Sequence, residues 1–133
     1  MKVVDTNVFL RYFTNDVPAK AVASRQFLFD LGRTSQAYVT ESVLAEVVYV
    51  MLKVYKATRK EIVDSFLPVL AVNGLVMDDK AMIFRALQLF SNHSYLDFED
   101  ALTVAHMERR GITEIVSYDL DFDRIEGIKR VEP

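Results

Sequence analysis

The sequence of 133 residues has the length of one domain, and its 51% apolar and 26% charged residues exclude a disordered or low-complexity chain. The absence of cysteine excludes a disulfide scaffold, a thiolate zinc site and a cysteine nucleophile. The formal net charge of −3 argues only weakly against a nucleic-acid-binding protein, because clustered carboxylates that bind divalent cations are neutralised in the working state.

The first part of the chain contains two short apolar strands separated by a helix. The strands are expected over residues 2–4 and 37–39. Between them, Asp16 and Pro18 are typical of a helix start, since proline is tolerated in the first turn. This helix is expected to end at Gly32. Its inward-facing positions are Phe27, Leu28 and Leu31.

Two helices are predicted in the middle of the chain. Residues 42–55 are rich in valine, but their length favours a buried helix over a strand. Thr58 followed by Glu61 is the pattern of a capping box, which opens the next helix. The apolar residues of that helix recur at helical spacing, at Ile62, Phe66, Val69 and Leu70.

The next strand and helix are expected from residue 75 onward. Residues 75–77 form a possible third strand, and Asp78 and Asp79 mark the start of a helix. This helix has the clearest amphipathic pattern in the chain. The residues of its apolar stripe are Ile83, Ala86, Leu87 and Phe90.

The last part of the chain is expected to contain one helix and two strands. Asp97 is the predicted N-cap of the helix, which ends at two arginines with Gly111 past its C-terminus. The strands cover residues 115–117 and 128–131, with a short turn or helix between them.

Short apolar strands that alternate with longer helical patterns predict βαβ units. The expected fold is a three-layer α/β/α sandwich with a central, mainly parallel sheet covered by helices on both faces. Four glycines, three prolines and no segment rich in serine, glycine or proline predict a single domain over residues 1–133. Because ligands of such sheets bind beyond the carboxyl ends of the strands, acids at those ends are candidates for a site.

Asp5 follows two valines at the carboxyl end of the first predicted strand. This position agrees equally well with a functional acid and with a residue that caps the turn into Thr6 and Asn7.

Glu46 lies inside the apolar block from Val43 to Leu52. If this helix is buried on nearly every side, the carboxylate needs a cation, a metal or a hydrogen-bond network, since an unpaired buried charge costs several kcal/mol. The alternative is a helix with one polar face that shows Ser42, Glu46 and Lys53.

Three acids, Asp97, Glu99 and Asp100, lie at the start of one predicted helix, where the helix dipole favours negative charge. Helical geometry separates them. Glu99 shares a helix face with polar residues. Asp100 shares a face with the apolar Val104 and Met107 and is therefore expected to point inward.

Asp119, Asp121 and Asp123 follow the strand over residues 115–117, and Asp119 is the nearest to the sheet. The other two also fit a turn. Four acids from distant parts of the chain are therefore expected to converge at one edge: Asp5, Glu46, Asp100 and Asp119. A site of carboxylates alone suits hard cations such as Mg²⁺ or Mn²⁺, and one or two such ions suit phosphoryl chemistry.

The chain resembles the PIN-domain family, most closely its small single-domain VapC-like toxins, over almost its whole length. The resemblance depends on four segments in this order: Val4 to Asn7, Glu46 within the helix from Ser42 to Leu52, Asp100-Ala101-Leu102, and Ser117 to Asp123. It implies a PIN-like fold and a metal-dependent ribonuclease that cleaves single-stranded RNA. The four acids of the family then correspond to Asp5, Glu46, Asp100 and Asp119.

The resemblance also implies supporting roles for three residues. Asn7 holds the first acid, Ser117 occupies a position where the family often has threonine or serine, and Asp123 supports the fourth acid. Asp97 competes with Asp100 as the third ligand, but it lies too far before the Ala101-Leu102 pair to match the motif.

The biological partners that the resemblance implies are RNA and, for the toxin of a toxin–antitoxin pair, an antitoxin protein. Phe9, Tyr12 and Phe13 are candidate antitoxin contacts, although core packing is the better explanation for Phe9. The alternative is a housekeeping PIN nuclease without an antitoxin. Apolar and aromatic contents of 51% and 11%, together with the pairing of family members, predict a homodimer.

Two other enzyme and signalling classes fit less well. A receiver domain needs an adjacent acidic pair after the first strand, and a dehalogenase-type phosphatase needs Asp-x-Asp there, whereas this chain has Asp5-Thr6-Asn7.

A basic cluster consists of Lys53, Lys56, Arg59 and Lys60, where one helix ends and the next begins. It is either a solvated helix end or a contact with RNA phosphates.

The sequence starts Met1-Lys2-Val3-Val4-Asp5, with a charge where the apolar run of a secretory leader is expected, and no apolar stretch approaches the ~20 residues that span a bilayer. We therefore expect a cytoplasmic protein without a membrane segment.

Overall fold

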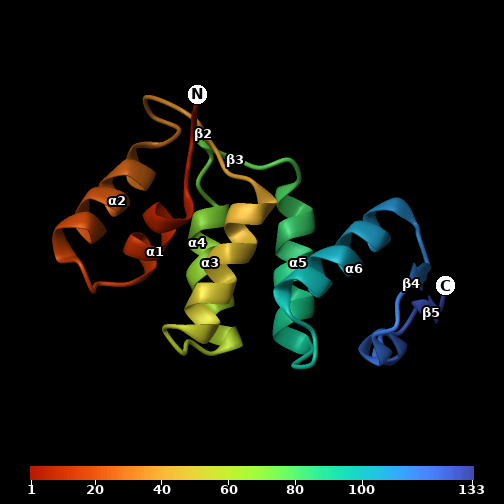
Figure 1. Cartoon of the computed structure of the whole chain (residues 1–133). Helices are drawn as coiled ribbons and strands as arrows, with labels where there is room; N and C mark the ends of the chain where they lie inside the picture. Colours follow the sequence, from red (N-terminus) through yellow and green to blue (C-terminus); the bar gives the residue numbers. More distant parts are fainter. The chain divides into compact units, whose positions relative to one another are not determined.

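Parallel strands and helices alternate along the chain, which the computed structural model describes from residue 1 to residue 133. Two compact units are distinguished, Met1–Lys80 and Ala81–Pro133, and Figure 1 labels most of the elements of both. That the two units form one domain stays a prediction. No helix combines the length and the apolar character that crossing a membrane requires.

The first unit contains a three-stranded parallel sheet in the order β1-β2-β3. Its strands are β1 (Lys2–Val3), β2 (Ala37–Tyr38) and β3 (Leu75–Val76), each shorter than predicted from the sequence. Ala37 lies in register with Lys2 on one side and with Leu75 on the other. Helices connect successive strands, as parallel pairing requires.

The helices of the first unit are α1 (Thr6–Phe13), α2 (Pro18–Asp30), α3 (Glu41–Lys53) and α4 (Arg59–Leu70). Helix α1 is not among the elements expected from the sequence, because it has only 8 residues and no capping side chain. The capping box that opens α4 is confirmed. The Glu61 N–H donates to Thr58 Oγ1 at 3.1 Å, and the Thr58 N–H donates to Glu61 Oε1 at 3.2 Å.

Asp16 does not cap α2 as predicted, since the N-cap residue is Val17 and no side chain caps this helix. The Asp16 carboxylate instead accepts hydrogen bonds from Arg11 Nη1 at 3.0 Å, from Thr14 Oγ1 at 2.8 Å and from the Tyr55 hydroxyl at 2.8 Å. These donors, the Thr14 hydroxyl foremost, lower the pKa of Asp16 to about 2. Asp16 therefore links the end of α1 to the loop after α3.

Buried aromatic and aliphatic side chains fill the interior of the first unit. Phe9 is fully buried, which confirms core packing as its role, and Phe13 packs against Phe66 with ring centroids 5.0 Å apart. Other fully buried side chains of this unit are Leu44, Val47, Ile62 and Leu75.

Two glycine backbones cross closely before β3. A Cβ atom at Gly74 would overlap the backbone nitrogen of Gly32 and lie 2.5 Å from the carbonyl carbon of Leu31. Gly32 also has a φ of +84°, which favours glycine. The crossing therefore requires glycine at both positions.

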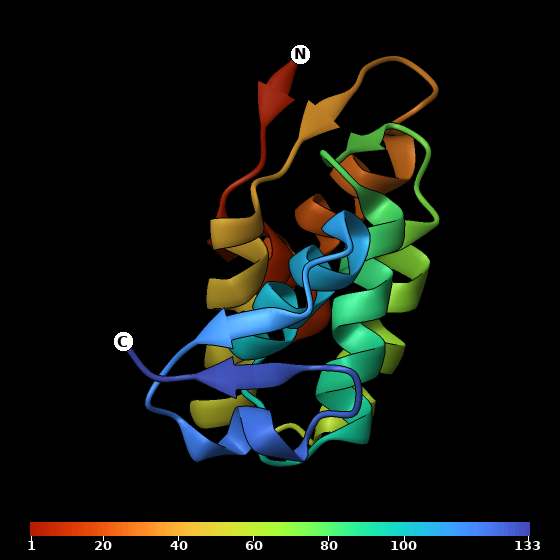
Figure 2. The same cartoon turned by 90° about the vertical axis from the view of Figure 1, so that its right-hand side faces the viewer.

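The second unit contains helices followed by a two-stranded parallel sheet. Its elements are α5 (Lys80–Asn92, which starts at the boundary between the units), α6 (Phe98–Arg110), β4 (Glu114–Val116), the 3₁₀ helix η1 (Leu120–Arg124) and β5 (Lys129–Val131). Figure 2 shows β4 and β5 side by side, with Glu114 in register with Lys129.

The helix signals predicted for the second unit are confirmed. The apolar stripe of α5, formed by Ile83, Ala86, Leu87 and Phe90, is buried along its whole length. The Asp97 carboxylate caps α6, and Gly111 ends this helix with a φ of 66° in the left-handed region. Phe98 packs edge-to-face on Phe90 at 6.0 Å between centroids.

Candidate functional site

Glu46 lies on the exposed face of α3, which corrects the expectation that this helix is buried on nearly every side. Leu44 and Val47, each at most 1% exposed, occupy the opposite face. Ser42 and Lys53 are exposed together with Glu46, because positions four and seven residues apart share a helix face. The polar-face alternative is therefore the correct description of the position of Glu46.

The Glu46 carboxylate is nevertheless held by a specific contact. The hydroxyl of Thr6, a side chain that is 5% exposed, donates a hydrogen bond to Glu46 Oε2 at 2.9 Å. Because Thr6 directly follows Asp5, this contact joins the carboxyl end of β1 to α3 across 40 positions of the sequence. Two of the four predicted site acids are thereby connected within the first unit.

Asp5 occupies the N-cap position of α1 without using its side chain as a cap. This observation removes the capping explanation for Asp5 and leaves its exposed carboxylate available to a ligand. Asn7, expected to hold Asp5, is exposed and forms no side-chain hydrogen bond.

Sequence reasoning did not identify Thr6 as a contact of the candidate site. The usable signal was its place in the sequence, directly after the candidate acid Asp5 and three residues before Phe9, a spacing that puts Thr6 and Phe9 on one face of a helix. The partner of its hydroxyl could not be predicted, since Glu46 is remote in sequence.

In the second unit, the acids at the start of α6 have the predicted division of roles. Asp97 Oδ1 accepts a hydrogen bond from the Asp100 N–H at 2.7 Å, which confirms Asp97 as the N-cap. Asp100 is half-buried, whereas Glu99 is exposed. Val104, on the same side of the helix as Asp100, is fully buried. The Asp100 carboxylate therefore faces the interior side of α6.

The environment of Asp100 disfavours its negative charge. Burial, followed by the charges of Asp97 and Asp119, raises the pKa of Asp100 to about 6. A carboxyl group crowded by other acids is neutralised either by a proton or by a bound cation. This crowding shows that Asp100 and Asp119, both predicted site acids, lie within electrostatic reach of each other.

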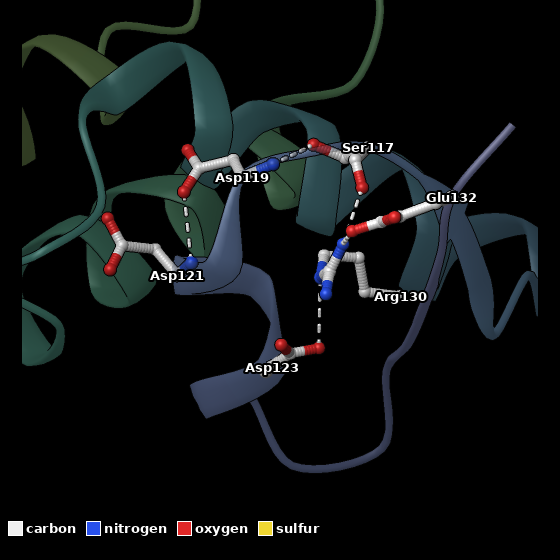
Figure 3. Close-up of polar contacts among 6 residues, drawn as sticks. All are labelled: Ser117, Asp119, Asp121, Asp123, Arg130 and Glu132. Atoms are coloured by element: carbon white, nitrogen blue, oxygen red, sulfur yellow. Dashed lines mark hydrogen bonds and ion pairs between the residues drawn. The ribbon is translucent and has the colours of Figure 1, made fainter.

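Asp119 follows β4 and is the N-cap residue of η1, and Figure 3 shows its polar contacts. Asp119 Oδ1 accepts a hydrogen bond from the Asp121 N–H at 2.9 Å, and the Asp119 N–H donates to Ser117 Oγ at 3.0 Å. Ser117 therefore fixes the backbone of the fourth predicted acid. Asp121 contributes its backbone N–H to this arrangement.

Asp123 pairs with Arg130 and makes no hydrogen bond to Asp119 (Figure 3). Arg130 Nε donates to Asp123 Oδ1 at 3.1 Å, and Arg130 Nη1 donates to the Ser117 carbonyl oxygen at 2.9 Å. The Arg130 side chain is only 12% exposed, so it connects β5 to the loop that carries Asp119. Sequence reasoning missed this arginine, because a single basic residue in a strand has no local signature.

The four predicted metal ligands are distributed over both units, with Asp5 and Glu46 in the first and Asp100 and Asp119 in the second. In neither unit are three or more acidic or histidine side chains gathered as a metal site. By donor chemistry the four carboxylates fit Mg²⁺ or Mn²⁺, which prefer oxygen ligands. Their convergence at one site stays a prediction.

Comparison with known proteins supports the resemblance found in the sequence. A sequence model of the PIN domain matches residues 2–128, nearly the whole chain. The chain is also 29% identical over 134 aligned positions to the VapC ribonuclease of Aquifex aeolicus, covering 100% of this chain and 97% of that relative. These matches, together with parallel pairing of every named strand, confirm the predicted α/β/α fold class.

Proposed function

The chain belongs to the PIN-domain family, and on this premise we propose that it is a metal-dependent endonuclease that cleaves single-stranded RNA. The observation that carries the proposal is the family match over residues 2–128 in a chain with acids at all four motif positions. The name of the relative from Aquifex aeolicus, VapC ribonuclease, supports RNA as the substrate.

The proposed ligands of Mg²⁺ or Mn²⁺ are the carboxylates of Asp5, Glu46, Asp100 and Asp119. When bound, a divalent ion supplies a water of lowered pKa and stabilises negative charge on the leaving oxygen of the phosphodiester.

The chain's own residues orient the proposed ligands before any ion is bound. The Thr6 hydroxyl restricts the Glu46 carboxylate, and Ser117 fixes the backbone that carries Asp119. Asp97 engages the backbone N–H of Asp100, so that its own carboxylate serves as a helix cap. Such prior orientation reduces the conformational entropy that ligand binding would otherwise lose.

We further propose that the protein is the toxin of a toxin–antitoxin pair, acts in the cytoplasm as a homodimer and is inhibited by an antitoxin protein. Its similarity to a VapC ribonuclease supports this role. Tyr12 and Phe13 are half-buried and so retain surface for an antitoxin, whereas Phe9 is fully buried and cannot contact one. A housekeeping PIN nuclease without an antitoxin is the second candidate. A small gene immediately upstream, whose product suppresses toxicity on co-expression, would favour the toxin.

The decisive experiment incubates the purified protein with defined single-stranded and duplex RNAs in Mg²⁺, Mn²⁺ or chelator. We expect cleavage of single strands only in the presence of a divalent ion. Asp5→Asn and Glu46→Gln should each reduce cleavage by at least about 100-fold, because the ligand set is incomplete. Glu99→Gln, which neutralises an exposed acid beside the site, is the matched control and should retain activity. Full cleavage in chelator would contradict the metal mechanism.

A further inference from the structure

An exposed stripe of side chains continues from Glu46 along α3. Tyr49 and Lys53 follow Glu46 at intervals of three and four residues, so the three residues share one helix face. The stripe from Glu46 to Lys53 spans about 10 Å at the helical rise per residue. Tyr49 is 63% exposed, its ring stacks on no other aromatic residue and its hydroxyl forms no hydrogen bond. Nothing within the first unit accounts for this exposed aromatic ring.

The basic cluster after the stripe is divided by its contacts. Lys60 Nζ pairs with Asp64 Oδ2 at 2.7 Å, an ordinary ion pair within α4. Lys53 and Lys56 are exposed, and neither ammonium group forms an ion pair. Lys53, which ends the stripe, and Lys56, which follows it, therefore keep their positive charges available to an external anion.

Lys56 has an unfavourable backbone conformation for its residue type. It is the only non-glycine residue with a positive φ, at 57°. The Ala57 N–H donates to the Met51 carbonyl oxygen at 3.0 Å, six positions earlier, which holds the chain reversal after α3. Glycine is the usual residue where the chain adopts a left-handed conformation just after a helix. Because the backbone favours glycine, the presence of lysine points to a role for its side chain.

We propose that Tyr49, Lys53 and Lys56 form a binding track for single-stranded RNA that extends from Glu46. This inference rests on the nuclease function proposed above. The Tyr49 ring stacks on a base, which is the usual way that exposed aromatic residues hold single strands. The ammonium groups of Lys53 and Lys56 bind successive phosphates beyond that base.

The composition of the track favours RNA over a second protein chain as its occupant. Lysine and glutamate are depleted at protein–protein interfaces, whereas two unpaired cations beside an exposed aromatic ring match the phosphates and bases of a single strand. The track also begins at Glu46, which the proposed function places at the reacting phosphate. Continuity with that site indicates that the track positions nucleotides beside the scissile bond.

The test measures the dissociation constant of a labelled single-stranded RNA pool of random sequence by fluorescence anisotropy, in chelator and at several salt concentrations. Tyr49→Ala should raise the dissociation constant at least about fivefold, whereas Tyr49→Phe should preserve it, because stacking needs only the ring. Lys53→Ala and Lys56→Gly should each reduce the slope of log affinity against log salt by about 0.7. Lys60→Ala removes the same charge from a paired ammonium and is the control, with an unchanged slope.

Lys56→Gly also distinguishes binding from folding, since the melting temperature should rise while RNA affinity falls. Equal affinities and slopes in all variants, or no binding of the pool by the wild type, would overturn the track. Conversion of a dimer to a monomer by Tyr49→Ala with unchanged affinity would identify a subunit interface and also overturn it. Metal-dependent cleavage of total RNA is measured in parallel. If no cleavage is observed while the variants still bind RNA more weakly, the proposed nuclease function is refuted and the proposed RNA-binding track is retained.

Discussion

Replacing Asp100 by asparagine separates a metal-binding carboxylate from an acid that only begins a helix. The raised pKa of about 6, compared with 3.8 for an ordinary aspartate, means that the folded protein disfavours the charged form. Ionisation of Asp100 therefore lowers the free energy of unfolding above pH 6. The effect decreases between pH 6 and 3.8 and is absent at lower pH, where Asp100 is protonated in both the folded and the unfolded state.

The magnitude follows from the shift of about two pH units, which corresponds to at most about 3 kcal/mol. Solvent screening of a half-buried carboxylate roughly halves this value, and loss of the charge–dipole interaction removes about 0.5 kcal/mol. Asp100→Asn should thus stabilise the metal-free protein by about 1 kcal/mol at pH 7.5, which raises the melting temperature by about 4 °C. At pH 3.5 the stabilisation should be absent.

The assay combines thermal melting in chelator at both pH values with Mg²⁺- or Mn²⁺-dependent RNA cleavage. Activity of Asp100→Asn should fall by orders of magnitude despite the gain in stability, because a proposed ligand is lost. Asp97→Asn is the control and should retain most activity, since asparagine also caps helices. A lower melting temperature at pH 7.5 would refute the electrostatic argument. Full activity of Asp100→Asn combined with loss in Asp97→Asn would show that Asp97 is the ligand.

Three further predictions concern the first unit. Thr6→Val should reduce RNA cleavage about tenfold because Glu46 loses its hydrogen bond, whereas Thr6→Ser should retain activity. Equal cleavage rates for the two variants would show that the hydroxyl is dispensable. Gly74→Ala should destabilise the protein by about 3 kcal/mol in urea denaturation because its Cβ would overlap the Gly32 backbone, so an unchanged midpoint would contradict that crossing. Asp16→Asn should lower the melting temperature at neutral pH, with the difference disappearing as the pH falls through about 2, because the lowered pKa of Asp16 confers stability only while the group is ionised. A difference that persists below pH 2 would assign the effect to packing.

Several features of the fold could be predicted from the sequence because they depend on residues a few positions apart. The capping box of Thr58 and Glu61 and the N-cap at Asp97 each involve backbone groups within the next turn. The left-handed Gly111 ends α6 for the same local reason. The order of the acidic motifs likewise indicated the PIN-domain family, which the match over residues 2–128 confirms.

Other features depended on contacts between residues distant in sequence. Glu46 is exposed because α3 buries only one face, and an apolar block does not by itself reveal how many of its sides are covered. The Thr6 hydroxyl can donate to Glu46 only after β1 and α3 have packed together. Asp16 does not cap α2 because its carboxylate accepts hydrogen bonds from other donors, which include the Tyr55 hydroxyl, 39 residues away. Local propensity fixes where helices begin and end, whereas the partner of a polar side chain is decided by which elements pack beside it.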